Sequence, residues 1–392
     1  MAKRTPLEVS VAVAEAAKMA DVDVVAAYPI TPQTHIVETL AEMVANGELD
    51  ANYIPVESEH SAMSACLGSS ATGARTFTSS AGQGLELMHE ALYIGPSSRL
   101  PMVLSVCNRA LSGPLSVWGD HSDAMAVRDT GWIQVFVENG QQAFDHILWA
   151  FRVSEDHQVL FPVMVHHDGF HLTHVIEPIT LPTQEDVDRF LPKPRYPYAL
   201  HPDNPVSIGC YAPPHIYSEV KRSQDAAFRS PEVKQAILKA WEDFGNIFGR
   251  YYSPVEQYRT EGAKVLLVTM GSFSETAMVA VDNKREEGKE VGIIRLRLWR
   301  PFPYEEIREL VKDADMVVVL DRCISPGAQA PVYSEIRSCL YQEENRPQVF
   351  SFTGGLGGRD IVVSDFEQMI DKGFEMLEKG SDKEFEIIGV RE

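Results

Sequence analysis

Short apolar runs alternate with stretches of helical periodicity between Val9 and Val175. Five of these runs have the length and the β-branched content of strands. They are Val22–Ala27, Tyr53–Val56, Arg75–Thr78, Met102–Val106 and Leu160–His166. Helices between successive strands are typical of βα units on a parallel sheet. The pattern therefore predicts an α/β layer over this part of the chain.

The rest of the chain divides into three parts. Prolines crowd the stretch 192–214, which therefore cannot be regular helix or central strand and is predicted to be an extended crossing segment. A helix is predicted over Pro231–Phe248, ending at Gly249. Three further strands are predicted at Val265–Thr269, Val291–Leu296 and Met316–Leu320. We expect two domains, residues 1–257 and 258–392.

Polar loops follow the apolar runs of the first unit. They are Tyr28–Pro32, Glu57–Glu59, Thr78–Ser80, Asn108–Arg109 and His167–Gly169. Ligands of open parallel sheets bind beyond the carboxyl ends of the strands. These loops therefore predict one binding site.

Two polar residues have the pattern of helix N-caps. Thr31 precedes Pro32 and an amphipathic stretch, which predicts that Thr31 caps the helix. Ser272 and Glu275 have the spacing of a capping box. Helix N-termini attract anions, so the turn at Thr31 can also hold a carboxylate. The pattern does not decide between this role and capping alone.

Glu59 lies between a predicted strand and the stretch 61–68, which is poor in bulky side chains. Small side chains allow a flat ligand or another backbone to come close. The alternative is a first-turn glutamate stabilised by the helix dipole. Both interpretations stay open from the pattern alone.

Arg109 follows the strand predicted at Met102–Val106. A guanidinium in this position can bind a carboxylate through two hydrogen bonds. The alternative is a surface arginine paired with Asp120 or Asp123, because charged loop residues are commonly solvated or paired.

Composition narrows the class of protein. The chain has 392 residues, 44% hydrophobic and 23% charged, which is typical of a globular protein. A net charge of −21 argues against a nucleic-acid surface.

Neither a signal peptide nor a membrane span is expected. The widely spaced cysteines are predicted to be reduced thiols of a cytoplasmic protein. They are Cys66, Cys107, Cys210, Cys323 and Cys339.

A group of histidines raises the question of a metal. The residues are His166, His167, Asp168, His171 and His174. Strand alternation sends His166 and His167 to opposite faces, and no ligand-spacing motif is present. No metal site is therefore expected.

Several motifs together resemble those of one enzyme family. They are Tyr28-Pro-Ile-Thr-Pro32, Glu57-Ser-Glu-His-Ser-Ala62, Asn108-Arg-Ala110, Asp120-His-Ser-Asp123, Arg128-Asp-Thr-Gly131, Asp168-Gly-Phe170 with His174, and Arg300-Pro-Phe-Pro303. In this order they resemble the α subunit of pyruvate:ferredoxin oxidoreductase, over nearly the whole chain. The resemblance implies an α/β fold. It consists of the pyrimidine-binding domain of a thiamine diphosphate enzyme, a parallel sheet with helices on both faces, and a domain similar to the C-terminal domain of transketolase.

The resemblance also implies roles for individual residues. Glu59 would hydrogen-bond the pyrimidine of thiamine, while Thr31 and Arg109 would hold the 2-oxoacid. Further cofactor contacts are implied for Tyr28, Pro29, Ile30 and Gln83. Family members often carry Ser-Ser where this chain has Ala81-Gly82, so no role is carried over to that pair.

Partner subunits would complete the enzyme. The chain contains no Gly-Asp-Gly motif, so the diphosphate and Mg²⁺ site is expected on a β subunit. The [4Fe-4S] clusters are expected on the β and ferredoxin-like δ subunits, and a γ subunit would complete the assembly. The implied reaction is oxidative decarboxylation of pyruvate with coenzyme A, giving acetyl-CoA, carbon dioxide and electrons for ferredoxin.

Three other functions stay open. One is a sister enzyme acting on 2-oxoglutarate or a branched-chain 2-oxoacid. Another is a non-catalytic structural subunit. The third is a synthase or decarboxylase that uses the same cofactor without electron transfer.

Overall fold

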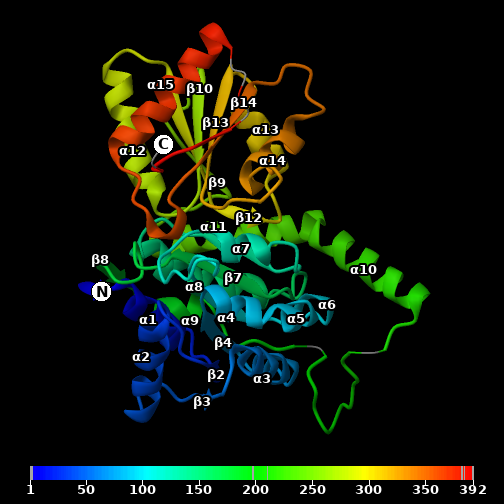
Figure 1. Ribbon diagram of the computed structural model, residues 1–392. Coiled ribbons are helices and arrows are strands. Elements are labelled where there is room, and N and C mark those ends of the chain that lie inside the picture. The colour runs from blue at the N-terminus through cyan, green and yellow to red at the C-terminus, as the bar shows by residue number, and fades with distance from the viewer. Residues whose placement is uncertain (1–2, 197, 210, 381–382, 384, 391–392) are drawn as a thin grey trace.

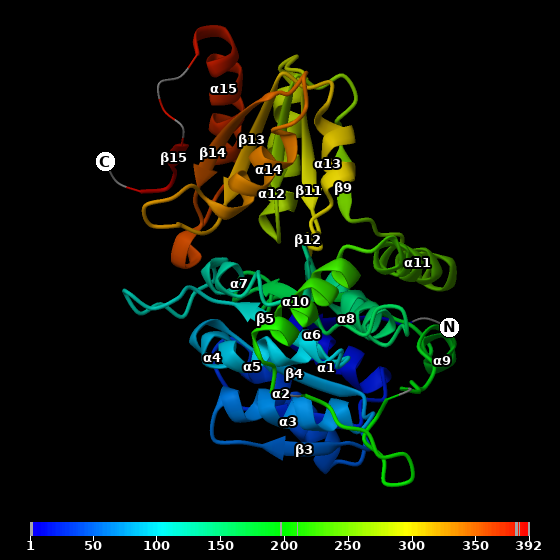
Figure 2. The same cartoon turned by 90° about the vertical axis from the view of Figure 1, so that its right-hand side faces the viewer.

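The computed structural model describes residues 3–196, 198–209, 211–380, 383 and 385–390, so Cys210 lies outside the described residues. Figure 1 and Figure 2 show two α/β units, one above the other, with the N-terminal half below. The strands are β1 Lys3–Glu8, β2 Val24–Ala27, β3 Asn52–Pro55, β4 Thr76–Ser80, β5 Val103–Asn108, β6 Ile133–Phe136, β7 Val163–Asp168, β8 Ile176–Leu181, β9 Val255–Tyr258, β10 Val265–Thr269, β11 Val291–Leu296, β12 Leu298–Arg300, β13 Met316–Asp321, β14 Gln348–Thr353 and β15 Phe385–Ile387. The helices are α1 Val9–Met19, α2 Thr34–Ala45, α3 Glu59–Ala71, α4 Gly82–Leu87, α5 His89–Leu92, α6 Ile94–Ser97, α7 Ser122–Ala126, α8 Gly140–Ser154, α9 Gln184–Phe190, α10 Pro214–Phe228, α11 Pro231–Phe248, α12 Phe273–Glu286, α13 Tyr304–Val311, α14 Pro331–Leu340 and α15 Val363–Lys379, with a 3₁₀ turn η1 at Leu356–Gly358.

The lower unit contains a seven-stranded sheet in the order β12-β6-β7-β5-β4-β2-β3. Its strand pairs are parallel except for the antiparallel edge strand β12. The five predicted strands of this region correspond to β2, β3, β4, β5 and β7, and the α/β class is confirmed. Strand β6 and the antiparallel ribbon of β1 with β8 were not predicted.

Helices cover both faces of this sheet. On β5, Val103 and Cys107 belong to a core shared with α1, α2, α8 and α11. The alternate residues Leu104 and Val106 pack against α3, α4 and α5. Side chains of a strand point alternately to its two faces, so both faces of this strand are apolar and buried.

The upper unit contains a six-stranded sheet in the order β15-β14-β13-β10-β11-β9. All of its strand pairs are parallel except the edge pair of β9 with β11. The three strands predicted here are confirmed as β10, β11 and β13. Leu266 and Val268 of β10 pack toward α13 and α14, while Val265 and Leu267 pack toward α12 and α15.

One strand links the two units. Strand β12 follows β11 of the upper sheet directly, yet it pairs with β6 of the lower sheet. Strand β9 opens the upper sheet at Val255, three residues before the predicted start of the second domain. The chain therefore crosses between the units more than once.

Two helices follow the proline-rich stretch. Helix α11 has the predicted bounds and ends at Gly249, whose φ of 73° lies in the left-handed region that glycine favours. Helix α10 extends away from the lower unit in Figure 1, and none of its residues is buried. Among the described residues, no helix is long and apolar enough to cross a membrane.

Candidate active site

Glu59 is the first residue of α3, at the carboxyl end of β3. The helix is capped by Ser58, whose Oγ accepts a hydrogen bond from Ser61 N at 3.3 Å. The Glu59 residue is only 5% exposed. Within the described part of the chain, its carboxylate has no hydrogen-bond or ion-pair partner. Such a buried carboxylate can accept a hydrogen bond from a bound ligand.

Helix α4 closes the site opposite Glu59. A Cβ atom added at Gly84 would lie 2.5 Å from Glu59 Oε1 and 2.7 Å from Ser80 Oγ. The Ser80 hydroxyl is buried and has no hydrogen-bond partner among the described residues. The absence of a side chain at Gly84 therefore lets the backbone of α4 lie directly against the Glu59 carboxylate.

Arg109 follows β5 and is 7% exposed. Its Nη1 donates a hydrogen bond to Thr31 O at 3.1 Å, and its Nε donates to Ser116 O at 2.9 Å. No carboxylate forms an ion pair with its guanidinium in the described residues. Burial lowers the pKa of Arg109, and the nearby charge of Asp123 opposes this shift. The surface ion pair considered from the sequence is therefore wrong.

The turn before α2 differs from its prediction. The helix begins at Thr34 and its N-cap is Gln33, so Thr31 is not the cap. Gln33 is buried and its Nε2 donates to Tyr28 O at 2.8 Å and to Ser79 O at 3.2 Å. These two bonds hold residues 28–33 as a separate turn against β4. Thr31 is exposed in this turn, with its backbone carbonyl bound to Arg109.

The remaining predicted contacts lie around the same turn. Tyr28 and Pro29 are exposed and Ile30 is half-buried. Gln83 of α4 donates from Nε2 to Ser112 Oγ at 2.6 Å, while its buried Oε1 has no partner among the described residues. The structure thus brings Thr31 to Arg109 through a direct hydrogen bond. It also brings Glu59 against helix α4, which carries Gln83.

Asp123 joins these loops, although the sequence pattern gave it no such role. Its Oδ2 accepts from Gly82 N and from Arg109 N, both at 2.9 Å. Its Oδ1 accepts from Asn108 Nδ2 at 2.8 Å and from Ala124 N at 2.7 Å. Burial raises the pKa of Asp123 to about 7, despite these hydrogen-bond donors. The position of Arg109 therefore depends on a buried aspartate 14 residues further along the chain.

Gly82 is the second residue that the sequence pattern did not identify. It has a φ of +47°, and an added Cβ would lie 3.1 Å from the Arg109 side chain. The Ala81-Gly82 pair carried no predicted role because it departs from the family pattern. Its geometry shows that glycine at this position gives Arg109 its space.

A second buried aspartate lies where the two units meet. Asp168, at the end of β7, accepts hydrogen bonds from His121 Nε2 at 3.0 Å and from the Arg322 guanidinium. Burial alone would raise the pKa of Asp168, but Arg322 and then His121 hold it well below its usual range. This network ties the loop after β5 to the end of β13.

Asp168 also explains why the predicted capping box is wrong. The Ser272 hydroxyl donates to Asp168 Oδ2 at 2.6 Å and makes no cap bond. Glu275 instead accepts from Asn139 Nδ2 at 2.7 Å. Ser272 and Glu275 thus form side-chain hydrogen bonds with residues of the lower unit instead of with the start of their own helix.

The histidines of the predicted group separate in the structure. His166 and His167 are buried in the sheet, where burial holds the pKa of His167 at about 3. His171 Nε2 lies 3.3 Å from Gly358 O. His174 instead approaches Glu8 and His35, on other elements of the lower unit.

Comparisons with known proteins show which chains are similar to this one. Residues 15–239 match the family model of pyruvate flavodoxin/ferredoxin oxidoreductase, thiamine diphosphate-binding, and residues 263–366 match pyruvate:ferredoxin oxidoreductase core domain II. The pyruvate synthase subunit PorA of Methanothermobacter thermautotrophicus is 48% identical over 359 residues, 92% of each chain. The ketoisovalerate oxidoreductase subunit VorA of Pyrococcus horikoshii is 45% identical, over 96% of this chain and 95% of its own.

A solved structure shares the fold. It is the 2-oxoglutarate:ferredoxin oxidoreductase from Magnetococcus marinus with 2-oxoglutarate, coenzyme A and succinyl-CoA bound. It matches 94% of this chain with a TM-score of 0.73 at 19% sequence identity, and this chain spans 65% of that one. At this identity the likeness concerns the fold alone.

Proposed function

The chain belongs to the pyruvate:ferredoxin oxidoreductase family as an α subunit, and we propose that it contributes Glu59, Arg109 and Thr31 to the active site. The reaction is the oxidative decarboxylation of pyruvate with coenzyme A to acetyl-CoA and carbon dioxide, with electrons passing to ferredoxin. The single observation that carries the site is that an unpartnered carboxylate and a buried guanidinium both lie against the same short helix, Glu59 at Gly84 and Arg109 at Gly82.

The residues around Glu59 fit the pyrimidine half of thiamine diphosphate. Glu59 and Ser80 are buried polar groups without partners in the described chain, and Gly84 lets both lie against α4. The Glu59 carboxyl would hold a proton shared with the pyrimidine ring, and the exposed turn of Tyr28, Pro29 and Ile30, with Gln83, would bound the ring. When bound, the cofactor supplies the electron sink for the loss of carbon dioxide.

Arg109 and Thr31 would bind the substrate. The Arg109 guanidinium has no carboxylate partner of its own and is nearly buried, so an entering carboxylate would form a charge-assisted hydrogen bond in a dry environment. Thr31 is exposed beside it and can donate its hydroxyl to the carboxylate or carbonyl oxygens. Asp123 fixes the backbone of Arg109 by accepting a hydrogen bond from Arg109 N.

The rest of the reaction needs partner subunits. We assign the diphosphate and Mg²⁺ site to a β subunit, and [4Fe-4S] clusters to β and a ferredoxin-like δ subunit, with a γ subunit completing a cytoplasmic complex. Coenzyme A is the acyl acceptor. The two-domain division stays a proposal, with the second domain starting near Val255 instead of residue 258 because β9 lies in the upper sheet.

The test is pyruvate- and CoA-dependent reduction of a low-potential dye by the complex purified with its native partners. Arg109→Ala should remove most of the activity while thiamine diphosphate stays bound. Arg109→Lys should keep only part of the wild-type activity, because a lysine ammonium cannot form two parallel hydrogen bonds to a carboxylate. Arg189→Ala, which changes an exposed arginine on α9, is the matched control and should keep full activity.

The outcomes separate the alternatives. Activity with ketoisovalerate or 2-oxoglutarate but none with pyruvate would keep the mechanism and change the substrate. Activity without ferredoxin or dye would support a non-redox enzyme. A structural subunit predicts that Glu59→Gln and Arg109→Ala leave turnover nearly intact, which would overturn the proposal.

A further inference from the structure

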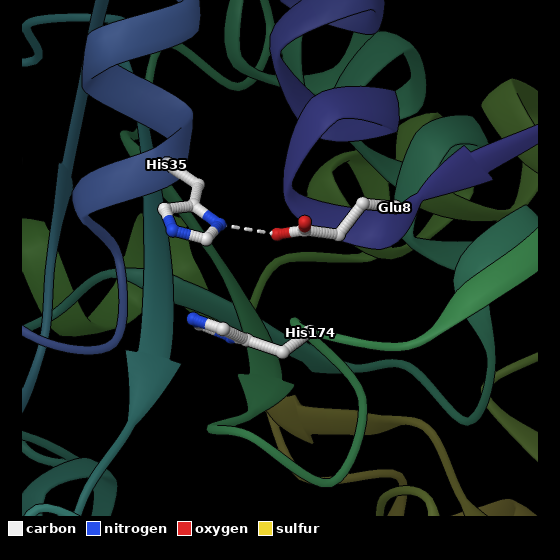
Figure 3. Close-up of side chains that lie close together, drawn as sticks. All are labelled: Glu8, His35 and His174. Carbon is white, nitrogen blue, oxygen red and sulfur yellow. Dashed lines mark hydrogen bonds and ion pairs between the residues drawn. The ribbon is translucent and has the colours of Figure 1, made fainter.

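A cluster of potential metal ligands lies behind the turn that carries Thr31. It consists of Glu8 at the end of β1, His35 in the first turn of α2 and His174 in the segment after β7. One ligand atom of each residue lies within 4.8 Å of the others. Figure 3 shows the Glu8 carboxylate directed at the His35 ring, with the His174 ring below them in this view. Three segments distant in sequence therefore present two imidazoles and one carboxylate together.

The closest pair in the cluster is already in contact. His35 Nδ1 lies 2.6 Å from Glu8 Oε1, and the side chains of His35 and Glu8 are 45% and 26% exposed. An ion from solvent can therefore reach the pair. The hydrogen bond between them would have to open by about 1 Å to admit zinc, whose tetrahedral ligands lie at about 2.0–2.2 Å from the metal.

His174 has its own fixed orientation. Its Nδ1 lies 2.8 Å from Thr173 Oγ1, and its ring contacts the rings of Phe170 at 4.6 Å and His35 at 4.7 Å. Histidines that bind metals usually donate their other ring N–H to an oxygen, which fixes the ring and leaves Nε2 for the metal.

We propose that Glu8, His35 and His174 bind one divalent transition-metal ion, with zinc as the best fit and water in the fourth position. Two imidazoles and one carboxylate form a ligand set that zinc uses where one position stays open. A hard ion such as Mg²⁺ prefers all-oxygen ligands and fits less well. This site is separate from the proposed thiamine and substrate residues.

The metal would link two segments next to the turn of residues 28–33, which carries Thr31. Residue His35 lies in the first turn of α2, just after the turn that carries Thr31, and an added Cβ at Gly169 would lie 2.8 Å from Pro32 Cγ. A metal ion held by His35 and His174 would therefore join both sides of the contact between Pro32 and Gly169. Because the ion binds the folded chain, zinc is expected to raise the unfolding temperature.

The experiment uses the intact complex, incubated with zinc, dialysed and analysed for zinc by mass spectrometry. Wild type should retain one zinc per α subunit more than each of Glu8→Gln, His35→Asn and His174→Asn, whose affinity should fall at least tenfold. His215→Asn, on exposed helix α10, is the matched control and should retain wild-type zinc. Iron and magnesium in the partner subunits are common to all samples and cancel in the comparison.

X-ray absorption at the zinc edge provides a second readout, which should show nitrogen and oxygen ligands including two imidazoles. Equal zinc in wild type and all three variants would overturn the proposal, as would sulfur ligands or no retained zinc in wild type. Glu8→Gln keeps the test valid if a histidine variant fails to fold, because Glu8 is at the surface end of β1. None of these outcomes depends on turnover, so they are independent of the proposed function.

Discussion

Asp123 and Asp168 are both fully buried aspartates near the carboxyl edge of the seven-stranded sheet, yet their surroundings differ. Asp123, beneath the candidate site, accepts only neutral N–H groups, and burial raises its pKa to about 7. Asp168, at the junction of the units, faces Arg322 and His121, which hold its pKa low against the effect of burial. A buried carboxylate remains charged where a cation reaches it, and tends to keep its proton where none does.

The different surroundings of Asp123 and Asp168 suit the different roles of the candidate site and the junction of the units. At the junction, an ion pair fixes two sheets relative to each other and leaves no charge for a ligand. At the site, the guanidinium of Arg109 is not neutralised by Asp123, which binds its backbone instead. An unpaired arginine stays available for a substrate carboxylate.

The largest effect is expected when Asp168 loses its cation. Arg322→Met should lower the free energy of unfolding by about 3–5 kcal/mol, because the carboxylate stays buried without compensation. Denaturant unfolding of the full-length chain measures this. Arg222→Met, in an exposed pair on α10, should cost less than about 1 kcal/mol.

A double variant refines that test. Asp168→Asn combined with Arg322→Met removes both charges and should recover much of the loss. Equal losses in the single and double variants would mean that Arg322 acts through its packing over Phe273, at 4.3 Å, instead of its charge.

The next largest effect is expected from a glycine substitution in the candidate active site. Gly84→Ala places a Cβ 2.5 Å from Glu59 Oε1, so the carboxylate has to move. A displacement of about 1 Å can cost on the order of a hundredfold in rate. Gly68→Ala in α3 is the matched control, because nothing lies within 4 Å of its added Cβ. That control should keep activity and gain about 0.5–1 kcal/mol of stability. Full activity of Gly84→Ala would argue against Glu59 as a cofactor ligand.

Asp123→Asn should have a smaller effect than either. The asparagine side chain has one oxygen. Its NH₂ group would therefore face two of the N–H groups from which the carboxylate now accepts hydrogen bonds. The expected cost is about 1–3 kcal/mol of stability, with a higher KM for pyruvate because Arg109 loses its anchor. Asp203→Asn, at an exposed residue, is the control. An unchanged KM would show that the anchor does not set the position of Arg109.

The pH dependence gives the finest test, because the two aspartates act with opposite signs. The folded-state pKa of Asp123, about 7, lies above the unfolded value of about 3.9, so its contribution is present at low pH and is lost as pH rises through about 7. Asp168 has a lowered pKa, so its contribution is present above about pH 4 and is lost in stronger acid.

Stability should therefore fall between about pH 5 and 7 by up to about 1.4 kcal/mol per pH unit for each such group. Asp321, whose pKa burial also raises to about 7, adds to this slope. Thermal unfolding across this range should give a shallower slope for Asp123→Asn than for wild type. An identical slope in both proteins would contradict the pKa assigned to Asp123.

Several elements were predictable because their sequence signals are local. Apolar runs with β-branched residues located β2, β5, β10 and β11, because the strands of a covered parallel sheet are apolar on both faces. The stripe of α11 and its terminal glycine were equally local. Glu59 and Arg109 were recognisable as candidates because they follow predicted strands, at the edge where ligands of parallel sheets bind.

Only the tertiary structure decided which partners the polar side chains take. Thr31 and Ser272 have the sequence pattern of helix caps, but Gln33 takes the N-cap position of α2 and Ser272 bonds to Asp168, 104 residues away. The short strand β6 and the roles of Asp123 and Gly84 also depend on neighbours that are distant in the chain. Helix and strand propensities act over a few residues, whereas a buried polar group takes whichever partner the packed fold brings within about 3 Å.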